Sequence, residues 1–96
     1  KVAIINNLGI ENLASSWKLV LAKDGHDVTA VGLSDHEPAI ETVIYVKKEG
    51  MGTELLEYFK NAKIVVEDIT SRVNVATKNA DVFIVLGHQH SVVPEV

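Results

Sequence analysis

The chain has 96 residues, enough for one domain with its own hydrophobic core. Its net charge is −4 and its basic residues form no cluster, which argues against a protein that binds nucleic acid through phosphates. It contains no cysteine, which excludes disulfides and thiolate metal sites, and no apolar run reaches the ~20 residues of a membrane-spanning helix. Because the chain begins without methionine, we expect it to belong to a longer protein whose leader or membrane anchor lies upstream.

The N-terminal segment has the pattern of a buried strand, a polar turn and an amphipathic helix. The apolar run at residues 2–5 predicts a strand covered on both faces, and Asn6 to Gly9 predict a turn. Helical spacing then predicts a helix over 10–23, with this apolar face: Ile10, Leu13, Ala14, Trp17, Val20 and Leu21. Gly25 has the position of a left-handed C-cap. We expect Trp17 to be a core residue, since only an exposed indole would offer a platform for sugars.

Four later segments have the β-branched or apolar composition of strands, and they lie at residues 27–31, 42–47, 64–67 and 82–86. Thr53 is a plausible N-cap for a second helix, in which Leu55, Leu56 and Phe59 form the apolar side and Asn61 the end. Residues 33–41 and 69–80 have the polar or mixed composition of loops. We expect residues 88–96 to form a loose tail.

These elements predict an α/β (α+β) fold in the order β-α-β-β-α-β-β. Two crossover units place two main helices on a mixed sheet of about five strands, within one domain spanning residues 1–96. The run at 82–86 is apolar throughout, which favours a central strand. A split βαβ arrangement with an added strand is the simplest closure.

In their order and spacing, these motifs resemble the LytR C-terminal domain, found in cell-wall proteins of the LytR/CpsA/Psr group. The matching motifs are Ile4-Ile5-Asn6-Asn7-Leu8-Gly9, Asn12-Leu13-Ala14, Asp24-Gly25-His26-Asp27-Val28, Thr42-Val43-Ile44-Tyr45 and residues 80–87. The family usually has glycine at positions 7 and 12, where this chain has asparagine, a residue that also accepts left-handed backbone. The family usually has aspartate at position 89, where this chain has Gln89, so a function of that carboxylate does not carry over.

The resemblance implies an extracytoplasmic accessory module of the cell envelope, attached through an upstream transmembrane segment. Such a module binds a wall glycan or peptide, above all peptidoglycan, or an envelope protein. The family brings no catalytic motif and no cofactor, so we expect no enzyme.

The expected ligand site lies where the first strand gives way to the helix N-terminus, because backbone donors and asparagine amides converge there. The segment after the last strand reaches the same edge if the first and last strands are parallel neighbours. The predicted site residues are Asn6, Asn7, Gly9, Asn12, Gly87 and His88. The alternative is that the asparagines only cap the helix and shape the turn.

Two other chemistries remain open from the residues. A nucleotide or metabolite site, as in a fragment of an enzyme, would use a G-x-G-x-x-G fingerprint over residues 7–12, of which only Gly9 is present. A metal site would combine His88 and His90 with His36 or a carboxylate, although a polar loop explains the two histidines better. Glu67 and Asp68 are adjacent in a strand, so they point to opposite faces and form no acid–base pair.

Overall fold

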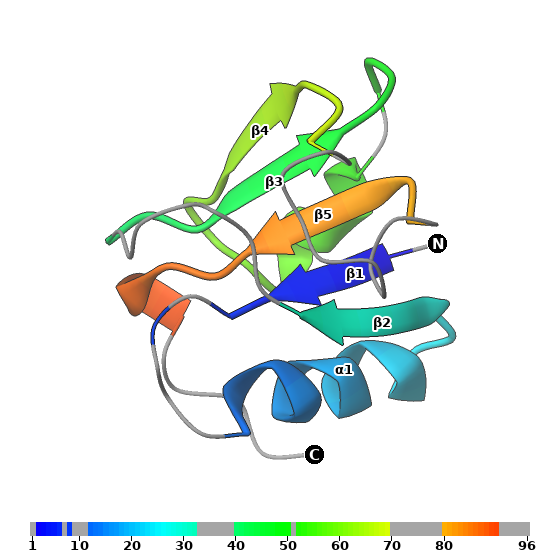
Figure 1. Cartoon of the computed structure of the whole chain (residues 1–96), viewed down its shortest axis with the longest axis vertical. Coiled ribbons are helices and arrows are strands. Elements are labelled where there is room, and N and C mark those ends of the chain that lie inside the picture. Colours follow the sequence, from blue (N-terminus) through cyan, green and yellow to red (C-terminus); the bar gives the residue numbers. More distant parts are fainter. Residues whose placement is uncertain are drawn as a thin grey trace.

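A mixed sheet of five strands and one α-helix form the framework of the protein in the computed structural model (Figure 1). The structure describes residues 2–6, 8, 12–32, 40–50, 52–69 and 80–90, and for residues 29–32 it describes the backbone alone. The elements are β1 (Val2–Ile5), α1 (Leu13–Lys23), β2 (Val28–Gly32), β3 (Val43–Val46), the 3-10 helix η1 (Thr53–Glu57), β4 (Lys63–Val66), β5 (Val82–Val85) and the 3-10 helix η4 (His88–His90).

The strands lie in the order β2-β1-β5-β3-β4. β1 is parallel to both of its neighbours, β2 and β5, whereas β3 is antiparallel to β5 and parallel to β4. Every residue of β1 and β5 is buried, since these strands are apolar throughout and have a neighbour on either side. The predicted mixed sheet and the central position of the last strand are therefore confirmed.

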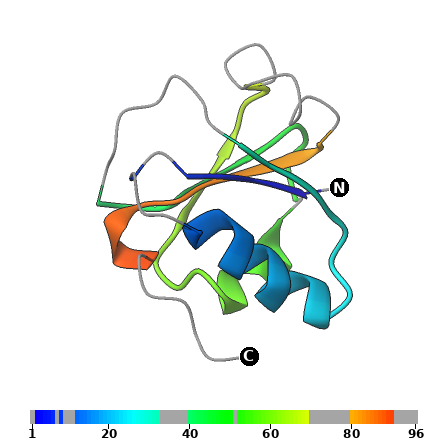
Figure 2. The ribbon, with the colours of Figure 1, turned by 60° about the horizontal axis from the view of Figure 1, so that its bottom comes forward.

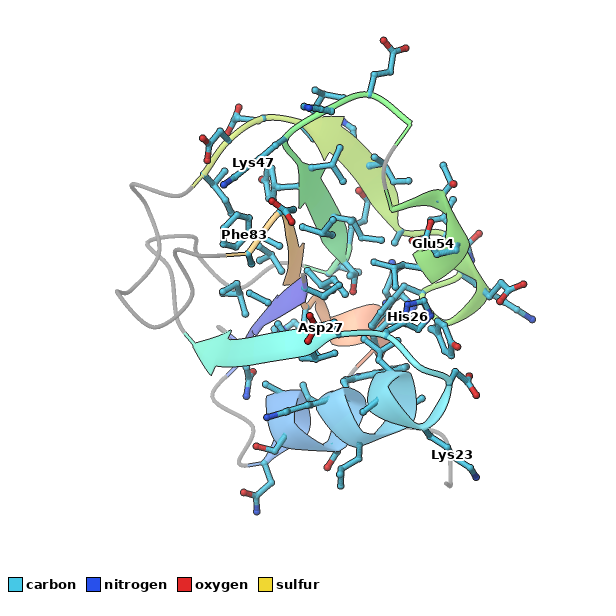
Figure 3. The ribbon with its side chains drawn as sticks, turned by 90° about the vertical axis from the view of Figure 1, so that its right-hand side faces the viewer. Lys23, His26, Asp27, Lys47, Glu54 and Phe83 are labelled. Carbon is cyan, nitrogen blue, oxygen red and sulfur yellow. The ribbon has the colours of Figure 1, made fainter. Side chains whose placement is uncertain are left out.

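The two faces of the sheet carry different cores. α1 and η1 lie on the same side (Figure 2), where Trp17, Leu55 and Phe59 pack against alternate strand residues such as Ile4 and Ile84. On the opposite face, Phe83 packs with Ala3, Ile5, Ile69, Ala80 and Val85. Figure 3 shows this division, with Glu54 of η1 and Phe83 on opposite sides of the sheet.

α1 begins later than predicted and ends where predicted. Leu13 is its first residue, and Asn12 before it is left-handed at φ 64°, which is incompatible with helical backbone. At the other end, Gly25 is left-handed at φ 91° and its amide donates to the Ala22 carbonyl, while the His26 amide donates to the Leu21 carbonyl. This pair of bonds is a Schellman motif, which confirms the predicted glycine cap.

Two expectations about the architecture are wrong. The second helix is only the five-residue η1, because left-handed Gly52 precedes it and left-handed Asn61 turns the chain into β4 soon after it ends. The arrangement is also not a split βαβ unit, because the two strands of each crossover pair directly and β5 lies between the two crossover units.

The expected loose tail also begins differently. His88–His90 form η4, and His90 is buried against the rest of the fold, while residues 91–96 lie outside the described residues. Most of the expected loop at 69–80 lies outside them as well.

Candidate functional site

The carboxyl ends of β1 and β5 meet at one edge of the sheet, on the side where α1 begins (Figure 1). Ile5 lies opposite Val85, and the Leu86 amide donates to the Ile5 carbonyl at 2.9 Å. The segments that follow the two strands are therefore neighbours, which is the condition under which the predicted site residues share an edge. We use the name carboxyl rim for the described residues that follow β1 and β5, together with the residue before α1, which begins on the same side: Asn6, Asn12, Gly87, His88 and Gln89. The predicted site residues Asn7 and Gly9 lie outside the described part of the chain.

Two asparagines shape the α1 side of the carboxyl rim. Asn6 is half-buried, and its Oδ1 accepts a hydrogen bond from the Leu8 amide at 3.2 Å, which closes a local turn. Asn12 is exposed, and its side chain makes no hydrogen bond that caps α1, although its carbonyl accepts from the Ser16 amide at 3.0 Å. Asn12 thus has a turn-shaping backbone, as in the capping alternative, but it presents its side-chain amide to solvent.

Gly87 lies where the chain after β5 crosses the segment that leads into β3. Its amide donates to Thr42 Oγ1 at 2.9 Å, and the Gln89 amide donates to the Ile40 carbonyl at 3.0 Å. A Cβ atom at position 87 would lie 2.5 Å from the Ile40 carbonyl oxygen and closer still to the Glu41 carbonyl group. Only glycine permits this crossing.

His90 connects the carboxyl rim to three other elements from a buried position. Its Nδ1 lies 2.6 Å from Thr42 Oγ1, and its ring donates a hydrogen bond to the Lys60 backbone carbonyl. Its own carbonyl accepts the indole Nε1–H of Trp17 at 3.0 Å. The ring also meets the Phe59 ring edge-to-face, with centroids 5.1 Å apart. Burial lowers the pKa of His90, and the hydrogen bond to Lys60 opposes this shift.

The alternative chemistries gain no support from the described geometry. His88 is exposed while His90 is buried and engaged, so the two imidazoles do not face one site. Among the described residues, no group of three His, Cys, Asp or Glu side chains is arranged to hold a metal ion, and His36 lies outside them. Trp17 is 1% exposed, which confirms the core interpretation and excludes a sugar platform at this indole.

The sequence did not predict that the buried side chains of Thr42 and His90 hold the Gly87 segment of the carboxyl rim in place. Thr42 was predicted only as a strand residue, and His90 was considered as a residue of a polar loop near the rim or as a metal ligand, not as a buried partner of Thr42. The hydroxyl–imidazole contact joins residues 48 positions apart. The one local signal was a polar Thr42 at the start of an apolar strand, and that signal does not identify a partner.

Comparison with known proteins identifies a family for this chain. The model of a family described as LytR cell envelope-related transcriptional attenuator matches residues 1–90. No curated protein and no solved structure matches the chain. Within the described residues, no helix has both the length and the apolar character that are needed to cross a bilayer.

Proposed function

The chain belongs to the LytR cell envelope-related transcriptional attenuator family, and on this premise we propose that it is a non-catalytic binding module of the cell envelope. Its ligand is a wall polymer, peptidoglycan in the first place, or a partner protein at the envelope, and the carboxyl rim is the contact surface. The module acts outside the cytoplasm, attached through a membrane anchor upstream of Lys1.

The observation that carries this proposal is the parallel pairing of β1 with β5. It supports the proposal because the segments that follow β1 and β5 are neighbours, and the proposed site residues Asn6, Gly87 and His88 belong to these segments. Crevices beyond the carboxyl ends of parallel strands are where open α/β sheets bind ligands. Amide, imidazole and backbone groups without a cluster of charge suit a sugar or peptide better than a free phosphate.

The test is an NMR titration of the domain with muropeptides and, separately, with nucleotides. We expect muropeptide to shift the amides of the carboxyl rim and to leave the amides at the α1 C-terminus, around His26, unchanged. Affinity is modest, because the described residues of the rim include no Trp, Tyr or Phe on which a sugar could stack. Saturable nucleotide binding, or muropeptide shifts confined to the His26 end, would reject the proposal.

Two variants sharpen the test. Asn12→Gly keeps the left-handed backbone and removes only the amide, so we expect weaker muropeptide binding without loss of the fold. His88→Ala removes an exposed ring from the rim, whereas His26→Ala removes a ring beyond the C-terminus of α1 and serves as the matched control. Equal effects of the two histidine substitutions would place the ligand elsewhere.

A further inference from the structure

We propose that His90 is a proton-sensitive latch: the neutral ring holds the Gly87–Gln89 segment of the carboxyl rim in its binding geometry, and protonation releases that segment. The proposal rests on the proposed function for the identity of the ligand, but not for the latch itself. It assigns a role to a buried imidazole and a buried hydroxyl that the binding surface does not use directly.

The hydrogen bonds determine the protonation state of the ring. Thr42 Oγ1 accepts the Gly87 amide at 2.9 Å, so its single hydrogen is available to His90 Nδ1 at 2.6 Å. A backbone carbonyl can only accept, so the bond to Lys60 takes the hydrogen on Nε2. Thr42 and Lys60 therefore select the neutral His90 ring with its hydrogen on Nε2. In this state every donor and acceptor in the series of hydrogen bonds from the Gly87 amide to the Lys60 carbonyl has a partner.

A second proton breaks this order. In the doubly protonated ring, Nδ1 carries a hydrogen and must donate it to Thr42 Oγ1. The Thr42 hydroxyl hydrogen then has no acceptor, because Nδ1 and the Gly87 amide are both donors. Thr42 is 0% exposed, so water does not replace the lost partner without an opening of the structure. The charge would also lie among the rings of Trp17 and Phe59, away from solvent.

No neighbouring charge offsets this penalty. The charged or titratable side chains on the elements packed against the ring are Lys18 and Lys23 on α1, Glu41 before β3, Glu54 and Glu57 on η1, Lys60 after η1 and His88 on η4 itself. All of these side chains are solvent-exposed, and none contributes to the shift of the His90 pKa. Separation of residues 87–90 from Thr42 is therefore the response to protonation with the lowest free-energy cost, because it lets water hydrate the imidazolium.

Opening acts on the carboxyl rim through η4. The His90 amide donates to the Gly87 carbonyl and the Gln89 amide to the Ile40 carbonyl, both at 3.0 Å, while Trp17 donates to the His90 carbonyl. These bonds and the Thr42 bridge keep residues 87–90 against β3 and α1. Losing the bridge weakens the attachment of the Gly87 side of the rim and leaves the β1–β2 pairing intact.

The first experiment needs no ligand. Nitrogen-15 NMR of the chain is expected to show His90 with hydrogen on Nε2 at neutral pH and a pKa below 6.5. As His90 is protonated, the exchange protection factor of the Gly87 amide should fall about tenfold, while the amides of β1 keep theirs. A His90 pKa at or above 6.5, or a Gly87 amide that keeps its protection while His90 is protonated, would overturn the latch.

Threonine variants separate the hydroxyl from simple packing. Thr42→Val removes the hydroxyl at nearly constant shape, so the Gly87 amide should lose protection already at neutral pH. Thr42→Ser keeps the hydroxyl and should restore both the protection and its pH dependence. If the serine variant behaves like the valine variant, the threonine methyl group matters and the latch is wrong. If the valine variant does not fold, the serine variant and the titration of the unmodified chain still decide.

The last experiment connects the latch to binding. Muropeptide affinity, measured by NMR at neutral pH and at a pH where His90 is protonated, is expected to fall about tenfold in acid. The His88→Gln variant, altered at the exposed neighbouring histidine, should show the same fall. If muropeptide binds at neither pH, the proposed function is rejected and the latch is not. If its affinity is equal at the two pH values, the proposed effect of His90 protonation on the carboxyl rim is rejected.

Discussion

Gly87 is the residue at which one added methyl group meets a neighbouring backbone. Because a Cβ atom would overlap the Ile40 and Glu41 carbonyls, Gly87→Ala requires the segments on either side to separate. We expect a loss of about 3 kcal/mol or more in the free energy of unfolding, measured by urea denaturation.

Gly25→Ala is the matched control for this substitution. Gly25 is left-handed at φ 91°, but a Cβ atom there meets nothing within 4 Å, so the cost is only that of backbone strain, about 1 kcal/mol. Equal losses in the two variants would show that the crossing at Gly87 is not tight.

His90 also determines how the stability of the domain depends on pH. Its folded pKa is lowered by burial, so the unfolded chain binds a proton more readily than the folded one near pH 6.5. The contribution to stability is complete above that pH and is lost as the pH falls from about 6.5 toward the folded pKa. Urea denaturation between about pH 7.5 and pH 5 should show this decline.

The control for the pH effect is His88, the exposed neighbour on η4. His88→Gln should leave the decline unchanged, whereas His90→Gln should flatten it. A decline that persists in the His90 variant would assign it to another group.

At the scale of elements, Tyr58 joins the end of η1 to the end of α1 through two contacts. The Tyr58 hydroxyl donates to Asp24 Oδ2, and the His26 ring meets the Tyr58 ring edge-on with centroids 5.6 Å apart. The hydrogen bond to Asp24 raises the pKa of Tyr58 to about 12, with smaller contributions from burial and from the charges of Asp24 and Glu57.

Asp24→Asn should therefore lower the pKa of Tyr58 toward its ordinary value of 10.0. The measurement is phenolate absorbance against pH, with the Tyr58→Phe variant subtracted to remove the other tyrosine. Glu57→Gln is the control, because its charge is the smallest of the causes, and it should change the pKa little. A larger shift from Glu57→Gln than from Asp24→Asn would contradict the contact.

Local sequence predicted the elements well where one pattern dominates. The apolar runs of β1 and β5 have no competing period, and Gly25 ends α1 where a left-handed residue is needed. The prediction of a second α-helix was wrong because the three apolar residues after Thr53 fit a short 3-10 helix as well as an α-helix. The positive φ of Asn61 cannot be predicted from the spacing of those residues.

Contacts between distant segments were beyond local reasoning. The sequence predicted a central position for the last strand, but the pairing of β1 with β5 remained only a condition there, and the pairing of β5 with β3 was not predicted. The part of the carboxyl rim on single turns, Asn6 and Asn12, was predictable from turn chemistry. The bridge from Gly87 through Thr42 to His90 was not, because its polar atoms meet only after the sheet has formed.

At the scale of the whole molecule, β5 joins two halves that share no other strand pairing among the described residues. β2 and β1 form one half, β3 and β4 the other, and β5 pairs with β1 and β3. A chain that ends at Ala80 therefore loses the centre of the sheet, and we expect it to show no cooperative thermal transition by circular dichroism. A chain that ends at His90 keeps every described element and should melt cooperatively. Cooperative melting of the shorter chain would show that the halves fold alone.

The place of β5 also constrains when folding takes place during synthesis. The strand that completes the sheet comes from residues 82–85, while its partner β1 is the first strand made. The two edges of β1 cannot both be paired until residues 82–85 have left the ribosome, and until then one edge of this apolar strand stays open to other chains. Such distant pairing also folds slowly. The domain therefore reaches its native state only after the segment at residues 82–85 has been synthesised and has paired with both β1 and β3.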